Sequence, residues 1–459
     1  MKEVYNKASY KNSILGEFHE EFTENKKVSS PRLNINEINK EEIPDLFKNY
    51  DYEVCSWPII IDSYKSSLLE ELTFKIPKLI SKIPELYFKN DIKKIADYYY
   101  EGNQIMAQLG LISLQMNPNS SIRLDLSLPE TDFKVLEVNA GSLLGGFELS
   151  SFESVLRDLH PSFLNFPREK FKSYNVQQKY FQFLINEVLN YTGEKNEVNI
   201  FIGLTDKEDS VRQNAMKFIN GLVKKEFTKF KIKGKAFTGD VSELKNENGA
   251  VTYRGIPIHG ITLLGKNIPL DKTIYRSFIQ KKVYLTTHFG YAILGDKRSL
   301  VLLRKLALQN SFSKEENELI LRSIPFTESL SEKITVFKGK EYDVLELIKE
   351  QKNNFVIKDA VGAQGDNVFI GEFETEKSWN EIINLGLEKN YIIQEYCASK
   401  NYLAPNKNNL WVDHKLIWGA FGFGEEYGGV WGRLSETIND VGVINSAKGA
   451  VEAIIFEYN

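Results

Sequence analysis

The sequence is poor in cysteine and histidine, and none of its apolar runs is long. Its 459 residues include only two cysteines, Cys55 and Cys397, which are far apart and have no cysteine or histidine at ligand spacing. A disulfide scaffold and a zinc site are therefore not expected, and free thiols fit a reducing cytoplasm. The five histidines are scattered without the spacing of a catalytic triad or a metal site, so we assign them no role.

No apolar stretch approaches the roughly 20 residues of a membrane span, and the polar opening MKEVYNKASYKNS contains no signal-peptide core. A strong bias in charge is also lacking, because 58 basic residues stand against 62 acidic ones, a net charge of −4. Such a balance gives no reason to expect nucleic acid or anionic lipid as a partner. We expect a soluble, cytoplasmic protein with neither a membrane nor a nucleic acid as partner.

The chain is long enough for two or three domains, and its 42% apolar and 26% charged residues are ordinary for a globular protein. Apolar residues at three- and four-residue spacing predict helices over residues 41–115. A long helix ending at Gly193 leads into a small α/β unit over residues 198–285, which opens with the buried strand EVNIFIGLTD. The last third begins with a helix marked by Gly295 and Asp296 and then alternates strands with helices.

The stretch SIRLDLSLPETDFKVLEVNAG predicts two strands around a polar turn. Side chains alternate between the two faces of a strand, so Arg123 and Asp125 share one face of the first strand. Glu137 and Asn139 share one face of the second strand for the same reason. A turn centred near Thr131 places Asp125 opposite Glu137, and it places Arg123 opposite Asn139.

Two carboxylates at one cross-strand position repel each other unless a cation lies between them or one is protonated. Asp125, Glu137 and the amide oxygen of Asn139 are the hard oxygen ligands that magnesium takes, and they leave positions open for phosphate and water. Arg123 adds a fork of donors for a phosphate or carboxylate. The alternative interpretation is a solvated hairpin face with an Arg–Asp surface pair.

A second pattern, NNFVIKDAVGAQGDNVFIG, predicts a strand ending at Lys358, a loop with Gly362 and Gly365, and a second strand. Such a flap can lay N–H groups against phosphates while the lysine neutralises charge, although a plain hairpin turn is an alternative. It is not a Walker loop, because no Lys-Ser or Lys-Thr follows its glycine. The strand YIIQEYC ends in Gln394 and Glu395, at a suitable distance for the far wall of a nucleotide cleft.

In this order the motifs resemble those of the circularly permuted ATP-grasp enzymes, of which glutathionylspermidine synthetase is the familiar member. In ordinary ATP-grasp chains the magnesium-binding Glu-x-Asn comes last, whereas here Glu137 and Asn139 precede Lys358 by more than two hundred residues. The resemblance implies a mixed α+β and α/β architecture with a permuted ATP-grasp core. The implied divisions are an N-terminal helical region (1–115), metal-binding hairpin strands (116–160), a preATP-grasp-like α/β domain (161–290) and a nucleotide-binding region (291–459).

The resemblance also assigns roles to residues. Asp125, Glu137 and Asn139 are implied as magnesium ligands, and Arg123 as the transition-state arginine. Arg433 of GGVWGRLS supplies a further cation that could be structural; we expect it to act with Arg123 in stabilising the transferred phosphoryl group or the acyl phosphate. Lys297, in GDKRSLVLL, matches a lysine that reaches ATP phosphates. The nucleotide-binding residues implied in this way are Lys297, Lys358, Gly362, Gln364, Gly365, Gln394, Glu395, Tyr396 and Cys397.

The implied activity is an ATP-dependent carboxylate–amine ligase that forms an amide or peptide bond through an acyl phosphate, with ATP and Mg²⁺ as cofactors. Its expected partners are an amine and a small-molecule, peptide or carrier-bound carboxylate. Two departures from the family are Asp359, where a proline is usual, and the flap sequence GAQG, which differs from that of glutathionylspermidine synthetase. The alternatives are an ATP-grasp phosphotransferase and a non-catalytic module that binds nucleotide.

Overall fold

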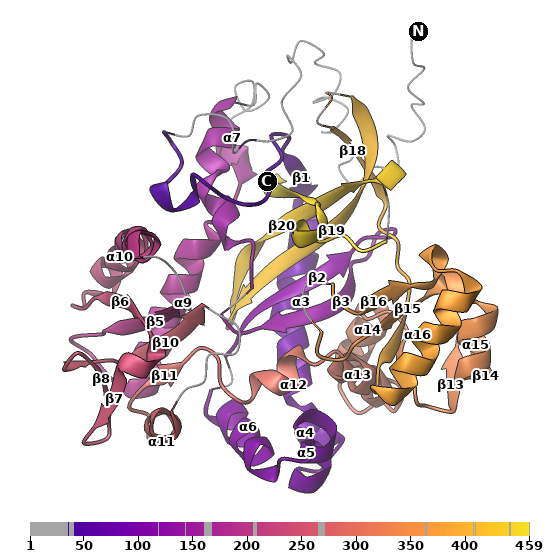
Figure 1. The fold of residues 1–459 in the computed structure, drawn as a ribbon, viewed down its shortest axis with the longest axis horizontal. Coiled ribbons are helices and arrows are strands. Elements are labelled where there is room, and N and C mark those ends of the chain that lie inside the picture. Colours follow the sequence, from indigo (N-terminus) through magenta and orange to yellow (C-terminus); the bar gives the residue numbers. More distant parts are fainter. Residues whose placement is uncertain are drawn as a thin grey trace.

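The computed structural model describes residues 35, 41–117, 119–142, 144–159, 168–204, 209–264, 271–362, 365–406, 408, 410–439 and 442–458. A central sheet carries an α/β unit on one side and a smaller antiparallel lobe on the other (Figure 1). In the part of the chain described, no helix combines the length and the apolar character needed to cross a membrane.

The central sheet has eight strands and contains the predicted hairpin. Its order is β1-β21-β20-β19-β2-β3, with β18 beside β19 and β4 beside β21. Only β1 is parallel to its neighbour, and all the other pairs are antiparallel. The bounds are β1 Ile59–Asp62, β2 Ser121–Ser127, β3 Lys134–Ala140, β4 Phe171–Lys172, β18 Asn401–Pro405, β19 Trp411–Phe423, β20 Glu426–Glu436 and β21 Val451–Tyr458.

The segment predicted to be wholly helical contains one strand, β1, so the prediction is wrong there. Its three isoleucines are apolar and β-branched, and they lie buried in a strand that pairs with β21. Asp62 ends the strand, and its side chain accepts the N–H of Lys65 to cap the next helix. The predicted helices follow as α3 Ser63–Ser81, α4 Ile83–Leu86, α5 Ile92–Tyr99 and α6 Gln104–Met116.

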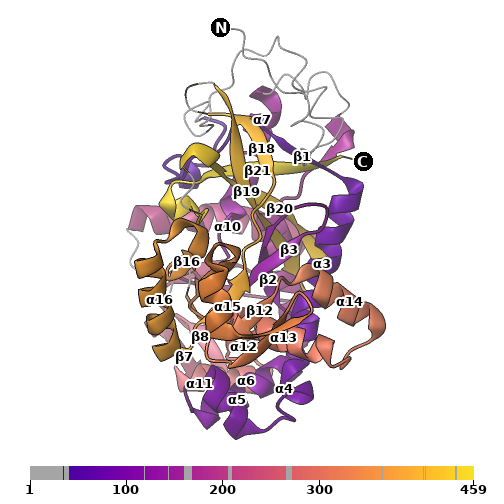
Figure 2. The same cartoon turned by 90° about the vertical axis from the view of Figure 1, so that its right-hand side faces the viewer.

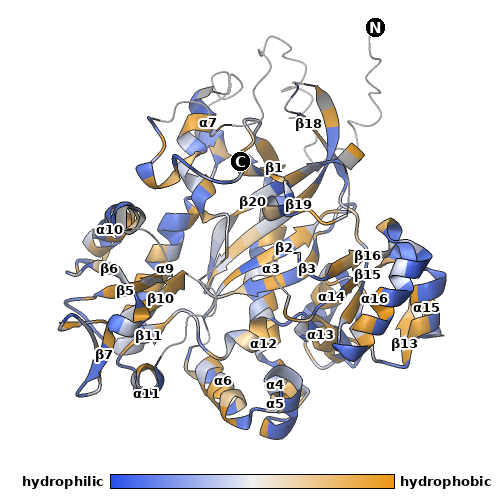
Figure 3. Ribbon diagram, in the orientation of Figure 1, coloured by the Kyte–Doolittle hydropathy of each residue, from blue (hydrophilic) through white to orange (hydrophobic). Residues whose placement is uncertain are grey.

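The predicted helix and α/β unit are present. The helix α9 (Val176–Thr192) ends at Gly193, whose φ of +73° is the left-handed conformation that glycine adopts most readily. Four parallel strands then form a second sheet, and β5 and β10 are strongly hydrophobic in Figure 3 because both faces of the sheet are covered. The bounds are α10 Asp209–Phe230, α11 Lys272–Ile279, β5 Ile200–Leu204, β6 Ala236–Gly239, β10 Gly260–Leu264 and β11 Tyr284–Leu285, with a three-stranded sheet of β7 Leu244–Glu247, β8 Ala250–Tyr253 and β9 Ile256–Pro257.

The antiparallel lobe has a hydrophobic core of its own, centred on the fully buried Trp379. Its four-stranded sheet runs β12-β17-β15-β16, and β15 and β16 form the predicted flap hairpin. The bounds are β12 Thr327–Ser329, β13 Ile334–Phe337, β14 Lys340–Asp343, α15 Val344–Glu350, β15 Phe355–Lys358, β16 Val368–Ile370, α16 Glu376–Glu388 and β17 Ile392–Glu395.

Helix α13 joins the lobe to the rest of the molecule, because it packs against β12 as well as α3 and α14 (Figure 2). Asp296 precedes it and accepts the N–H of Arg298 at 2.8 Å, which confirms the predicted helix start and fixes Lys297 between them. The remaining helices are α7 Glu153–Leu159, α12 Tyr291–Gly295, α13 Arg298–Leu308 and α14 Lys314–Ser323.

Replacing Trp379 by phenylalanine should destabilise the lobe by about 2 kcal/mol. The substitution leaves a cavity and removes the 2.9 Å bond from the indole Nε1 to the carbonyl of Ile348. Hydrogen exchange of the β15 and β17 amides measures the effect, and faster exchange is expected. Val336→Ala, at an exposed position of the same lobe, is the control and should change little. Equal exchange in both variants would contradict a core built on Trp379.

Candidate functional site

The predicted register of the hairpin is confirmed. Asp125 of β2 lies opposite Glu137 of β3, and Arg123 lies opposite Asn139. An irregularity in the pairing follows Asp125, where the ladder shifts by one residue. The four polar side chains therefore share one face of the central sheet, as the alternation of side chains requires.

Asp125 is held by two arginines from different strands. Arg123 donates from Nε to Oδ1 at 2.6 Å and from Nη2 to Oδ2 at 3.1 Å. Arg433, on β20, donates from Nη2 to the same Oδ2 at 2.8 Å. All three residues are buried, so the alternative of a solvated hairpin face is wrong.

Asp125, Arg123 and Arg433 form an ion triad, in which the two guanidinium groups keep the carboxyl of Asp125 ionised. Burial alone raises the pKa of the Asp125 carboxyl, but Arg123 and Arg433 outweigh it and hold that pKa well below its usual range. Arg123 is almost fully engaged, since its Nη1 also lies 3.4 Å from the carbonyl of Gly145. Arg433 keeps unused donors, because its buried Nε has no partner among the described residues.

The two predicted lysines approach the hairpin from different parts of the chain. Lys297, before α13, places Nζ 3.3 Å from Glu137 Oε2 and donates to the carbonyl of Gly362 at 2.6 Å. Lys358, at the end of β15, donates to Gln394 Oε1 at 2.6 Å and lies 3.5 Å from the carbonyl of Leu136. Both lysines are buried, and burial lowers the pKa of Lys358 to about 8 even though Glu137 opposes the shift.

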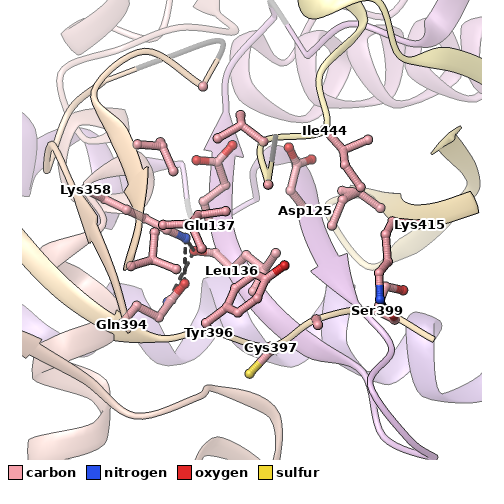
Figure 4. Close-up of a pocket in the computed structure, with 18 of the residues that line it drawn as sticks. Asp125, Leu136, Glu137, Lys358, Gln394, Tyr396, Cys397, Ser399, Lys415 and Ile444 are labelled. Atoms are coloured by element: carbon pink, nitrogen blue, oxygen red, sulfur yellow. Dashed lines mark hydrogen bonds between the residues drawn. The ribbon is translucent and has the colours of Figure 1, made fainter. Parts of the chain in front are cut away.

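A cavity opens between the hairpin, the lobe and the end of the chain. Of the predicted residues, Arg123, Asn139, Lys297 and Gly362 do not line it. The first three contact Asp125 or Glu137, which do, and Gly362 accepts a bond from Lys297. In Figure 4 the carboxylates of Asp125 and Glu137 lie close together, and Lys358 reaches Gln394. The predicted residues that line the cavity are Asp125, Glu137, Lys358, Gly365, Gln394, Glu395, Tyr396, Cys397 and Arg433.

The flap contacts the cavity through Gly365, and Gln364 lies outside the described residues. Gly365 has a φ of +73°, and a Cβ there would lie 2.8 Å from Val443. Lys448 donates to its carbonyl at 2.8 Å, so the flap rests on the loop before β21. Asp359, which departs from the family pattern, accepts the N–H of Val361 at 3.1 Å and so stabilises the flap turn.

The predicted hinge forms one wall of the cavity, but part of its backbone is already used. The N–H of Glu395 donates to the carbonyl of Phe326, and that of Tyr396 donates to the carbonyl of Asn354. Any base that binds a hinge N–H would therefore have to use the amide of a later residue such as Cys397. Burial raises the pKa of the Cys397 thiol to about 11, so this side chain is not a thiolate nucleophile.

Several lining residues were not predicted. Lys415, on β19, reaches into the cavity and donates to the carbonyl of Ser399 at 3.2 Å. The loop residues 442–445 also line it, and Val443 and Ile444 supply an apolar wall. Side-chain alternation along β19 places Lys415 on the same face as Gly419, which lies opposite Asp125. The sequence alone could not reveal this, because it requires knowing that β19 pairs with β2.

Two carboxylates and one amide are available for a metal ion. No group of three or more histidine, cysteine or acidic side chains suited to a metal occurs in the described ranges. Glu137 is about one-quarter exposed, and its oxygens have only long contacts, 3.3 Å to Lys297 and 3.4 Å to Asn139. The carboxylate of Glu137 thus keeps lone pairs that suit a hard cation, whereas Asp125 would have to give up an arginine bond.

Comparison with known proteins supports the fold but does not establish the family or the activity. No protein-family model matches the chain, and a search of curated proteins gives no match. A solved structure of a glutathione synthetase-like effector from Globodera pallida, in its apo form, matches with a TM-score of 0.55 and 12% identity over 88% of this chain and 89% of that chain. A Methylobacillus flagellatus protein with a proposed assignment as gamma-glutamylcysteine synthetase matches with a TM-score of 0.42 and 10% identity over 85% and 88%. The first likeness shows a related, synthetase-like fold, and the second is too weak to carry an argument.

The free energy of unfolding should rise with pH between about 8 and 10.5 because of Lys358. In that window Lys358 is still protonated in the unfolded chain but has lost its proton in the folded protein. Lys358 therefore contributes a positive slope to the free energy of unfolding against pH, up to about 1.4 kcal/mol per pH unit. Urea unfolding across this range measures it, and Lys358→Met should flatten the curve. Lys389→Met, at an exposed lysine of the same lobe, should retain the slope. Parallel curves for wild type and Lys358→Met would contradict the buried position of the ammonium.

Proposed function

We propose that this protein is an ATP-dependent carboxylate–amine ligase whose active site is the cavity between the hairpin and the lobe. The observation that carries the proposal is a buried excess of positive charge. Four cations, Arg123, Arg433, Lys297 and Lys358, surround two carboxylates, Asp125 and Glu137, and all but Glu137 are buried. A third acidic residue, Glu452, lies opposite Arg433, but burial raises its pKa to about 7, so it offsets only part of the positive charge. Uncompensated buried charge is costly, so this cluster favours an anionic ligand such as a polyphosphate.

The cations have distinct parts in this proposal. Lys358 lines the cavity and neutralises phosphate oxygens from the side of the lobe, while Lys297, paired with Glu137, adds positive charge from the main body. Arg433, which lines the cavity and donates only its Nη2 to Asp125, directs its guanidinium group to the phosphoryl group that is transferred. Asp125 keeps Arg123 and Arg433 in place, so that no reorganisation is needed when charge builds up.

The donor set fits a magnesium ion together with a nucleotide. Glu137 and the amide oxygen of Asn139 would hold the ion, with phosphate and water oxygens as further ligands, and Asp125 would join if one arginine bond opened. When bound, magnesium supplies neutralisation of phosphate charge. The apolar walls formed by Leu136, Ile417 and residues 443–444 suit the flat faces of a base.

The proposed reaction has two steps. A carboxylate oxygen of the acid substrate attacks the γ-phosphorus of ATP, which gives an acyl phosphate and ADP. The nitrogen of the amine then attacks the acyl carbon, phosphate leaves, and the nitrogen loses a proton to form the amide. No nucleophile of the protein is required, because positioning and charge neutralisation provide the catalysis.

The chain order supports a circularly permuted ATP-grasp arrangement. Strand β3, which carries Glu137 and Asn139, comes before the lysine of the flap in the sequence, yet it lies beside that lysine in space. The fold shared with a glutathione synthetase-like protein agrees with a synthetase, although a fold can host several activities. The residues of the cavity, and not the fold alone, therefore support the reaction.

Glu137→Gln should weaken binding of MgATP at least tenfold, because the substitution removes the carboxylate charge at the metal position. Calorimetric titration of ATP with and without Mg²⁺ measures this effect. Glu130→Gln, an exposed residue in the turn of the same hairpin, is the matched control and should bind MgATP as the wild type does. The melting temperatures should stay close together, since Glu137 is not fully buried.

A screen of acid and amine pairs for ADP release then tests the reaction. A requirement for both an acid and an amine supports the ligase. A stable phosphorylated product formed without an amine would instead indicate a phosphotransferase. Absence of ATP binding by the wild type would contradict both activities.

A further inference from the structure

Trp431 of β20 fills a slot made by two glycines beside the ion triad. It lies opposite Gly419 of β19, and Gly419 in turn lies opposite Asp125 of β2. A Cβ on Gly419 would stand 1.9 Å from the indole Nε1, and a Cβ on Gly146 would stand 2.6 Å from Cε2. The indole of Trp431 is therefore packed between the sheet and the loop after β3, directly above Gly419.

Both arginines of the triad lie over this indole. The guanidinium carbon of Arg123 is 5.4 Å from a Trp431 ring centroid, and that of Arg433 is 5.2 Å away. A cation near the face of tryptophan is stabilised most strongly where water is excluded, and Trp431 is only 5% exposed. Asp125 holds the same two groups from the sheet, so each arginine is positioned by one carboxylate and one aromatic ring.

The repulsion between the two guanidinium groups explains why an aromatic ring is needed beside them. Arg123 and Arg433 converge on one carboxylate, so one of the two positive charges within the triad is not compensated by Asp125. Without the indole, the guanidinium groups could change rotamer or draw water into the space above Gly419. The electron-rich ring occupies that space and offsets part of the repulsion.

We propose that Trp431 is a positioning residue that directs Arg123 and Arg433 toward the transferred phosphoryl group. This inference rests on the proposed function. Trp431 does not line the cavity, so its effect passes through the two arginines and not through contact with substrate. The slot also accounts for glycine at positions 146 and 419, where any other residue would displace the ring.

The test compares binding of MgADP with binding of MgADP–aluminium fluoride, a mimic of a phosphoryl group in transfer. Trp431→Leu should leave the affinity for MgADP within about twofold and should weaken the fluoride complex about tenfold or more, because a displaced guanidinium loses its contact with the mimic. Trp431→Phe retains an aromatic face and should restore part of the loss. Combined with Arg433→Lys, Trp431→Leu should cost less than it does alone.

Trp418 provides the matched control. It is a fully buried tryptophan on neighbouring β19, its Nε1 also has no partner among the described residues, and it packs edge-on against Phe133 with no arginine over its ring in the described part of the chain. Trp418→Leu should lose stability as Trp431→Leu does while binding both probes normally. If Trp431→Leu does not fold, Trp431→Phe and Trp418→Phe are compared instead.

The outcomes separate this inference from the proposed function. Wild-type protein that binds neither probe would overturn both. Wild-type protein that binds the fluoride complex more tightly than MgADP, with Trp431 variants equal to Trp418 variants, would overturn the positioning role alone. A loss that is fully additive with Arg433→Lys would also overturn it, since Trp431 would not then act through Arg433.

Discussion

The carboxylate of Asp125, shared by two buried arginines, is the interaction on which the rest of the site depends. It links β2 to β20 across β19, where Gly419 has no side chain, so an ion pair joins two strands that are not hydrogen-bonded neighbours. A buried charge costs several kcal/mol unless it is paired, and breaking a buried pair leaves the partner uncompensated. The strands of the central sheet, the direction of each guanidinium and the shape of the cavity wall are thus coupled to one side chain.

A second constraint comes from the positive charges near the triad that Asp125 does not neutralise. Two lysines converge on the same region, and Glu137 is the nearby carboxylate with which one of them forms an ion pair. A protein that only needed stability would replace such residues by apolar ones, because buried ion clusters are often no better than hydrophobic packing. The presence of these charged residues is consistent with a ligand that carries negative charge. Burial, with a smaller contribution from the nearby Lys297, lowers the pKa of Lys358 on β15.

Local patterns predicted much of this site, and long-range pairing explains what they missed. The register of the hairpin followed from side-chain alternation and the turn centre, and the start of helix α13 at Arg298 followed from Asp296. The neighbours of the hairpin come from residues 411–436, about three hundred positions later, and nothing local indicates that β19 pairs with β2. Lys415 and Trp431 were therefore missed, and β1 was mistaken for helix because its isoleucines are buried by a strand at the far end of the chain.

The cations of the site are fixed by the protein and still keep donors for a ligand. An ammonium has three N–H groups, and Lys297 directs them to Glu137 and Gly362, so that one remains. Lys358 likewise contacts Gln394 and Leu136 and retains a third donor. Arg433 uses one nitrogen on Asp125. Because these cations are oriented by the protein itself, the proposed phosphoryl transfer would need little reorganisation of their side chains, which distinguishes this arrangement from a merely basic surface.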